Sequence, residues 1–357
     1  MVVCGDVSRI FVRFIGLALA GGYRFWFGHP FLQAYTNRGA FNTMRRGVLV
    51  LLFVFSVSVL ASIDVAGAVG IAEEVPPFSI TDDRGHSLRL EHFARRIVSL
   101  SPHITELIFA AGADGRLVGV SRYSDYPEAA KLVPDVGDSA SLDLERIIAV
   151  KPDLVIAWRS GTSASDIKKF EKLGFTVFAV EATRLEDVAR LLRMIGKLAG
   201  TSAQAEPAAS AYEAELQQIK RTYSNRQPIR VFPLIWHQPL MTVNGNHIIS
   251  DIIKICGGVN VFASASSLTP MISAENLLEA DPQAIISSVS LEFTETGMKQ
   301  RLPDISAVKS DHLFFVHPDL MHRQTPRMLQ AAKTVCMQLE RVRSSEGKKM
   351  IRGNTTL

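Results

Sequence analysis

The chain has 357 residues, of which 47% are hydrophobic and 21% are charged. This balance is typical of a folded globular protein and excludes an intrinsically disordered one. Of its 39 basic and 35 acidic side chains, six arginines and two aspartates precede residue 69, which leaves 33 of each sign in the rest. A neutral remainder offers no basic patch, so the composition argues against nucleic-acid binding.

Residues 44–68 have the features of an export signal. Arg45 and Arg46 give a charged start, and residues 48–61 form an apolar stretch that is too short to span a membrane. An Ala-Gly-Ala tripeptide that ends at Ala68 provides a cleavage site. We therefore expect a cleaved signal peptide and a periplasmic mature chain.

The stretch upstream of this signal is unusual. Residues 1–43 are apolar but interrupted by arginines and a proline, and we interpret them as a doubtful upstream extension. The alternative is a single uncleaved membrane anchor. No cysteine closely follows the apolar stretch at 48–61, which argues against a lipid-anchored form.

The first half of the mature chain, residues 69–200, alternates strands with helices. An alternating sequence around the Asp-Arg-Gly turn at 83–85 predicts a hairpin. Since the later strands are apolar throughout, they predict a parallel sheet that is covered on both faces. The strands are expected at residues 96–100, 117–120, 154–158 and 176–180, and the helices at 105–111, 142–150, 165–173 and 185–198.

A long helix is expected next, and a second half of the same style follows it. Residues 203–223 lack an internal glycine and would span roughly 30 Å, so the segment 201–226 is interpreted as a rigid connector. The second lobe is assigned to residues 227–357. Its strands are expected at residues 231–236, 240–243, 284–288 and 313–317, and its helices at 248–256, 273–280 and 325–342.

These elements predict an α/β fold with two Rossmann-like lobes. Each lobe would hold a parallel sheet, and a single long helix would join the two. In such sheets ligands bind beyond the carboxyl ends of the strands, so we expect the ligand cleft between the lobes.

Cys256 and Cys336 are the only cysteines after the leader. Exported chains meet oxidising conditions, in which a disulfide between them is stable. Two buried free thiols are the alternative.

Five segments resemble a known family when they are taken in order and with their spacing. The set resembles the periplasmic cobalamin-binding proteins of ABC importers, within the helical-backbone receptors for metal chelates. The likeness runs from about residue 97 to residue 339. The segments are 98–107 (VSLSPHITEL), 123–127 (YSDYP), 144–147 (LERI), 151–158 (KPDLVIAW) and 256–262 (CGGVNVF).

This resemblance implies a binding protein and not an enzyme. The protein would capture cobalamin or a related corrinoid as cargo, use no resident cofactor, and deliver its ligand as a monomer to an ABC importer permease. The resemblance also implies the fold described above and a disulfide between Cys256 and Cys336.

The resemblance places several residues at the ligand. Tyr123 matches a position whose ring packs on the corrin, and Trp158 ends a buried strand where its ring would point into the cleft. Arg323 matches a polar ligand contact, and together with Asp319 it would reach amides or a phosphate at the edge of the ligand.

The sequence departs from the family at two aromatic positions, which here hold about Ser139 and Thr269. Trp236 and Met241 are expected to replace part of this missing wall. The ligand expected from this pocket is cobalamin held differently, a precursor such as cobinamide, or another chelate.

His103 and His237 follow equivalent predicted strands in the two lobes. An imidazole can ligate cobalt or haem iron, so two histidines at a cleft could bracket a metal. Hydrogen bonding or helix capping is the alternative role for His103. Because no His-x-x-x-His or Cys-x-x-Cys pattern occurs, a zinc site made by the protein alone is not expected.

Glu145 and Glu275 each begin a predicted helix, one in each lobe. The resemblance implies that they pair with arginines of the permease, whereas simple stabilisation of the helix dipole is the alternative.

Other functions stay open at this point. A haem or ferric-siderophore receptor of the same class is the first alternative, and His103 and His237 favour it. A corrinoid- or metal-handling enzyme is the second. No Gly-x-Ser-x-Gly elbow or glycine-rich phosphate loop occurs in the sequence to support catalysis.

Overall fold

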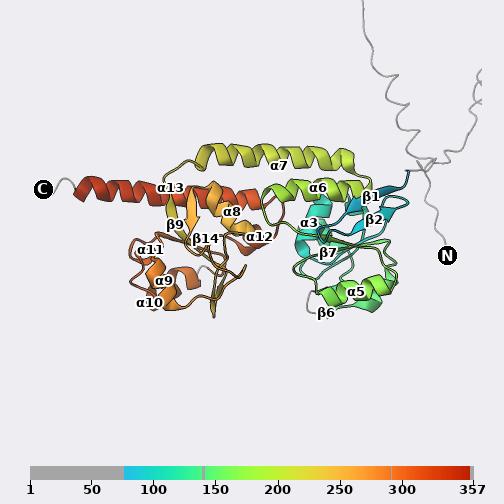
Figure 1. The fold of residues 1–357 in the computed structure, drawn as a ribbon, viewed down its shortest axis with the longest axis horizontal. Helices are drawn as coiled ribbons and strands as arrows, with labels where there is room; N and C mark the ends of the chain where they lie inside the picture. The colour runs from blue at the N-terminus through green and yellow to red at the C-terminus, as the bar shows by residue number, and fades with distance from the viewer. Residues whose placement is uncertain (1–75, 139–140, 291, 354–357) are drawn as a thin grey trace, which may run out of the picture. The chain divides into compact units, whose positions relative to one another are not determined.

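The computed structural model describes residues 76–138, 141–290 and 292–353. The predicted signal peptide and the upstream extension lie outside these residues. The described part belongs to one compact unit and contains two lobes, each with a parallel four-stranded sheet (Figure 1). The α/β fold with two Rossmann-like lobes is therefore confirmed.

The N-terminal lobe has the strand order β4-β3-β7-β8. Alternate strand residues enter different cores: Ile156 packs on one face of the sheet, and Val155 and Ala157 pack on the other. Burial of both faces agrees with the continuous apolar strands. The elements are β3 (Ile97–Ser99), α3 (Pro102–Ala110), β4 (Leu117–Val120), α4 (Leu144–Ala149), β7 (Leu154–Trp158), α5 (Ala164–Lys172), β8 (Val177–Val180) and α6 (Glu186–Ala199).

Two short hairpins complete this lobe. The turn predicted from Asp-Arg-Gly joins an antiparallel pair in which Phe78 lies opposite Leu90. The other hairpin precedes α4. Their strands are β1 (Phe78–Thr81) with β2 (Ser87–Leu90), and β5 (Gly137–Asp138) with β6 (Ser141–Leu142).

The C-terminal lobe has the order β12-β9-β13-β14. In chain order this is second, first, third, fourth, as in the other lobe, so the two lobes repeat one topology. The strands are β9 (Ile229–Leu234), β10 (Trp236–His237), β11 (Leu240–Met241), β12 (Gly258–Asn260), β13 (Ala284–Ser287) and β14 (Leu313–Phe315). The helices are α8 (Ile248–Ile255), α9 (Ala274–Ala280), α10 (Met298–Arg301), α11 (Ser306–Lys309), α12 (Pro318–His322) and α13 (Met328–Gly353).

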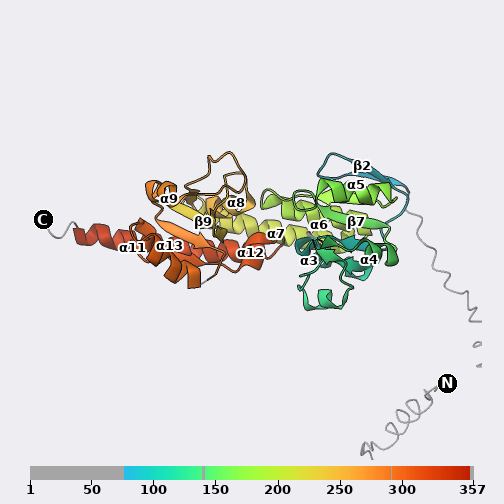
Figure 2. The ribbon, with the colours of Figure 1, turned by 90° about the horizontal axis from the view of Figure 1, so that it is seen from below.

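The long helix α7 (Ser202–Tyr223) joins the lobes, as the fold class required. Figure 2 shows it crossing from one lobe to the other. It packs on α6 in the first lobe and on α8 and α13 in the second. Its buried residues recur every three or four positions, which is the stripe of an amphipathic helix. They are Ala205, Ala209, Tyr212, Leu216 and Ile219.

This stripe belongs to a hydrophobic core that continues from one lobe into the other. The core runs from Leu107 and Leu191 through Leu216 to Ile252 and Val335. Sliding the lobes past each other would open gaps in close-packed side chains, which costs free energy. We therefore expect limited motion between the lobes.

Some element boundaries differ from the sequence predictions. The helix predicted from residue 105 begins at Pro102, because proline suits the first turn of a helix. The closing helix begins at Met328 and not at 325, so Pro326 lies before it. Strand β12 was not predicted, since three residues that include a glycine carry little pattern.

The disulfide between Cys256 and Cys336 is present and links the end of α8 to α13 across 80 residues of sequence. Both cysteines are fully buried.

None of the described helices has the length and apolar character that are needed to cross a bilayer.

Candidate ligand-binding site

Trp158, the last residue of β7, forms a wall of a pocket of about 360 Å³ in the N-terminal lobe. The pocket lies where β3, β4 and β7 end, which is where parallel α/β sheets bind ligands. Apolar and aromatic groups make up half of its lining, and polar or charged side chains make up the other half. The lining residues are Leu100, Ser101, Pro102, Ser121, Arg122, Tyr123, Asp138, Trp158, Gly161 and Thr162.

Three neighbours fix the indole ring of Trp158. Its Nε1 donates a hydrogen bond to Oε1 of Glu181 at 3.1 Å. The ring of His103 packs against it edge-on, with centroids 5.1 Å apart. A Cβ atom added to Gly161 would lie 1.9 Å from the indole, so only glycine leaves room for the ring. A wall held in place before binding lowers the entropic cost of capturing a ligand.

Tyr123 presents its ring to solvent and is 69% exposed. Its φ of +67° lies in the left-handed region, which is uncommon for a residue with a side chain. Such a conformation persists where the surroundings hold it. Here the Tyr123 carbonyl accepts hydrogen bonds from the backbone N–H of Asp125 and from Nη2 of Arg323. The ring is thus offered at the pocket by a constrained loop.

His103 is only 5% exposed, and its Nδ1 lies 2.7 Å from the hydroxyl of Ser101. Burial, with a smaller contribution from the positive charge of Arg323, lowers the pKa of His103 to about 3. The ring is therefore neutral at physiological pH. The ring hydrogen-bonds to Ser101 and supports Trp158, and its ligation of a metal stays a prediction.

Apolar side chains of the C-terminal lobe gather at the β10–β11 hairpin. Trp236 and Met241 are opposite each other in the β10–β11 ladder. Trp236 is 53% exposed, and its Nε1 donates to the carbonyl of Gln238 at 2.9 Å. Met271, itself 71% exposed, forms a bridge with Met241. Sequence reasoning had pointed to Trp236 and Met241 but had missed Met271.

The other histidine of the predicted pair, His237, packs on Phe293 with ring centroids 4.5 Å apart. Its Nδ1 is buried and has no hydrogen-bond partner among the described residues. No contact between His103 and His237 occurs in this part of the chain. The structure therefore does not bring the two rings together, and their bracketing of a metal stays a prediction.

Arg323 is engaged with carboxylates of both lobes. Its side chain is 13% exposed and lies 2.9 Å from Glu106, 2.7 Å from Asp125 and 3.1 Å from Asp319. Burial is the largest single influence on the pKa of Arg323 and lowers it. The hydrogen bonds and charges of these carboxylates together outweigh burial, so the pKa is raised. The predicted contacts of Arg323 and Asp319 with a ligand remain predictions, since here the two side chains bind each other.

Glu106 is the centre of this cluster and was missed by sequence reasoning. Its side chain is 3% exposed and also binds Arg327, whose Nε lies 2.9 Å from Oε2. The guanidinium of Arg327 covers the ring of Tyr126 at 3.8 Å. In the sequence, Glu106 is one acid in a short helix, and nothing there indicates that two distant arginines meet it.

Glu145 and Glu275 occupy equivalent places in the two lobes. Each is the second residue of its helix, α4 or α9, and each is exposed. The N-cap side chains of Asp143 and Ser273 already accept backbone hydrogen bonds at these helix starts. Neither glutamate forms an ion pair with another described residue, so both carboxylates are available to a partner.

Glu181 and Gly161 are further site residues that were not predicted. Glu181 follows β8 directly and accepts from both the Trp158 indole and the backbone N–H of Ser160. A signal existed, since a polar residue directly after a buried strand lies at the ligand-binding edge of the sheet.

No group of three His, Cys, Asp or Glu side chains suited to a metal is found in the described ranges.

Comparison with known proteins agrees with this architecture. The sequence model of the family described as "Periplasmic binding protein" matches residues 97–320. A vitamin B12-binding protein of Vibrio cholerae is 34% identical over 247 residues, which cover 69% of this chain and 90% of the relative. One of Yersinia pestis is 34% identical over 250 residues, covering 69% and 86%.

Solved structures give the same result. The periplasmic vitamin B12-binding protein of Vibrio cholerae aligns with a TM-score of 0.66 and 33% identity, covering 70% of this chain and 98% of that one. The apo form of a periplasmic heme-binding protein from Roseiflexus sp. RS-1 has a TM-score of 0.61 at 24% identity, covering 70% and 99%. The second likeness concerns the fold alone. The chain belongs to the periplasmic binding protein family.

Proposed function

We propose that this protein is the periplasmic receptor of an ABC importer and that its ligand is a corrinoid, with cobalamin as the first candidate. The observation that carries the proposal is the preformed aromatic pocket of Trp158 and Tyr123 in a chain whose relatives are named vitamin B12-binding proteins. A corrin ring offers a broad flat face, and aromatic side chains cover such a face at low entropic cost.

The two lobes would contribute differently to binding. The fixed indole of Trp158 and the exposed ring of Tyr123 supply contact area in the N-terminal lobe. Trp236 and Met241, with Met271 beside them, supply apolar area in the C-terminal lobe. These residues support the expectation that Trp236 replaces part of the wall that the family builds elsewhere.

Delivery would use the outer surface of the lobes. Glu145 and Glu275 would each meet an arginine of the permease, and one carboxylate per lobe fixes the orientation of docking. Such charge pairs mainly set register and association rate. The receptor would act as a monomer in the periplasm and would release its ligand chemically unchanged.

Calorimetric titration of residues 69–357 tests the ligand. Cyanocobalamin, cobinamide and haemin are titrated in parallel, and one-to-one binding of a corrinoid is expected. Haemin binding with a shifted Soret band and no corrinoid signal would contradict the proposal and assign the protein to the haem receptors. Recovery of cobalamin with an unchanged absorption spectrum after prolonged incubation is the matching test that no turnover occurs.

A further inference from the structure

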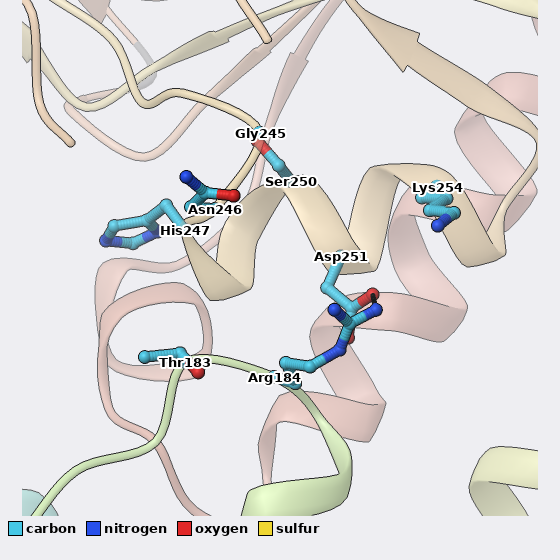
Figure 3. Close-up of a pocket in the computed structure, with 8 residues that line it drawn as sticks. All are labelled: Thr183, Arg184, Gly245, Asn246, His247, Ser250, Asp251 and Lys254. Carbon is cyan, nitrogen blue, oxygen red and sulfur yellow. Dashed lines mark ion pairs between the residues drawn. The ribbon is translucent and has the colours of Figure 1, made fainter. Parts of the chain in front are cut away.

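A second pocket, of about 490 Å³, lies between the lobes (Figure 3). The N-terminal lobe contributes two residues from the loop after β8, and the C-terminal lobe contributes α8, as far as Lys254 in its last turn, and the loop before it. Figure 3 shows the loop facing α8 along its side. The lining residues are Thr183, Arg184, Gly245, Asn246, His247, Ser250, Asp251 and Lys254.

A short segment of chain, residues 181–183, connects this pocket to the aromatic wall. Glu181 holds the indole of Trp158 through a hydrogen bond of 3.1 Å. Thr183 follows Glu181 by two residues, and two residues of chain span at most about 7 Å. A ligand as broad as a corrinoid that covers Trp158 therefore has its edge within reach of the second pocket.

The pocket carries more positive than negative charge. Arg184 is 63% exposed, and its Nη2 lies 3.9 Å from Asp251, which is a loose ion pair. The other oxygen of Asp251 accepts the backbone N–H of Leu185 at 3.0 Å. Lys254 is exposed and forms no ion pair with another described residue. Two cations and one carboxylate that is already in use therefore line the pocket. The carboxylate of Asp187 lies beside it and accepts the backbone N–H groups of Thr183 and Arg184.

The neutral groups of the pocket do not cancel this charge. His247 caps α8, since its Nδ1 accepts the backbone N–H of Ile249 at 3.1 Å. Burial, and then the neighbouring His322, lower the pKa of His247 to about 4, so the ring is uncharged at neutral pH. The N-terminus of α8 adds the positive end of the helix dipole.

The junction between the lobes at Arg323 differs in this respect. There Arg323 is bound by Glu106, Asp125 and Asp319, and its side chain is 13% exposed. A cation whose donors are held by three carboxylates and a backbone carbonyl has little to offer an incoming anion. Arg184 forms one ion pair with another described residue, at 3.9 Å, and the charge of Glu186 also lies near it, so its donors are less tightly engaged.

We propose that this pocket is a subsite of the ligand cleft that binds an anionic ester group, with Arg184 as its principal cation and Lys254 as the second. The inference rests on the proposed function, and it assigns the group as the phosphodiester of the nucleotide arm of cobalamin. Arginine binds phosphate oxygens through two parallel N–H donors, which is geometry that a loosely held guanidinium can adopt.

Two ligands separate this subsite from the aromatic one. Cyanocobalamin carries the phosphodiester, and cobinamide has the same corrin ring without the nucleotide. For Arg184→Gln and for Lys254→Gln, calorimetry should show cobalamin binding weakened about three- to tenfold, the range of a partly exposed charge pair. Cobinamide binding should change by less than about twofold.

Matched controls come from basic residues outside the cleft. Lys172→Gln on α5 and Arg341→Gln on α13 replace exposed cations of the same types and should leave both affinities unchanged. Raising NaCl from about 50 to about 500 mM should reduce the preference for cobalamin in the wild type, because exposed charges are screened. In Arg184→Gln and Lys254→Gln, the preference for cobalamin over cobinamide should change less with the NaCl concentration.

The outcomes distinguish the two proposals. Equal loss of both corrinoids, or no loss of either, would overturn the subsite while leaving the corrinoid receptor in place. A wild-type protein that binds neither corrinoid contradicts the proposed function itself, and the subsite with it. If the wild type binds inorganic phosphate tightly and Arg184→Gln does not, the pocket is a site for a free anion. That result would overturn its assignment to the phosphodiester of the ligand.

Discussion

Glu106 of the N-terminal lobe accepts a hydrogen bond from Nη1 of Arg323 in the C-terminal lobe at a distance of 2.9 Å. The carboxylate is almost fully buried, and Arg327 binds it as well. The same guanidinium of Arg323 also holds the carbonyl of Tyr123. The contact that joins the lobes therefore also fixes the loop that presents an aromatic ring to the pocket.

Breaking this contact should destabilise the protein. Glu106→Ala leaves two arginines without their buried partner, and loss of one member of a buried ion pair costs about 3 to 5 kcal/mol. Urea denaturation followed by circular dichroism measures the free energy of unfolding. Glu128→Ala removes an exposed partner of Lys131 and should cost less than about 1 kcal/mol. Equal costs for the two variants would show that Glu106 does not join the lobes.

Removal of the indole should weaken ligand binding without unfolding the protein. Trp158→Ala should cost about 1 to 3 kcal/mol of binding free energy, as expected for one large aromatic contact. Trp158→Phe keeps a ring but loses the hydrogen bond to Glu181, so an intermediate loss is expected. Isothermal titration calorimetry with cyanocobalamin measures both. Unchanged affinity in Trp158→Ala would remove this residue from the site.

The docking proposal separates binding from transport. A double variant, Glu145→Ala with Glu275→Ala, should bind cobalamin like the wild type but fail to support its uptake by cells. The reason is that both carboxylates are exposed and lie outside the pocket. Glu128→Ala with Glu279→Ala removes two other exposed acids and should transport normally. Normal uptake by the Glu145 and Glu275 variant would refute docking through these residues.

Acidification should destabilise the fold through His103. Its pKa in the folded protein is about 3, below the value of about 6.5 in an unfolded chain. The unfolded state therefore binds more protons between these values, and stability falls as the pH drops below about 6.5. The loss amounts to about 1.4 kcal/mol per pH unit, or about 2 kcal/mol at pH 5.

Thermal or urea unfolding between about pH 5 and 7 tests this dependence. His103→Gln should flatten it, and His92→Gln, an exposed histidine of the same lobe, should leave it unchanged. A residual slope is expected from His247 and His322, because burial also lowers the pKa of both rings. A slope that His103→Gln does not alter would show that this ring is not kept neutral by the fold.

The disulfide should stabilise the C-terminal lobe. Cys256 and Cys336 close a loop of 80 residues, and restricting such a loop in the unfolded chain is worth about 4 kcal/mol in the loop-entropy account. Cys256→Ala with Cys336→Ala should lower the free energy of unfolding by an amount of this order. Treatment of the wild type with dithiothreitol should have the same effect, whereas the double variant should not respond to the reagent.

The sequence by itself determined the elements and their class. Apolar strands such as residues 154–158, which alternate with helices, required a parallel sheet covered on both faces, and the structure has two. The lack of an internal glycine at 203–223 likewise marked the long helix. These patterns are local, because side-chain periodicity and helix breakers act over a few residues. The position of Trp158 at the carboxyl end of its strand followed from the same patterns.

Only the tertiary structure decided which distant residues meet. Glu106 and Arg323 lie 217 positions apart, and Arg184 and Asp251 come from different lobes. No spacing rule connects such pairs, since their approach depends on how α7 and the shared core set the lobes against each other. For the same reason the sequence did not show that His103 is buried against Trp158, or that three carboxylates bind Arg323.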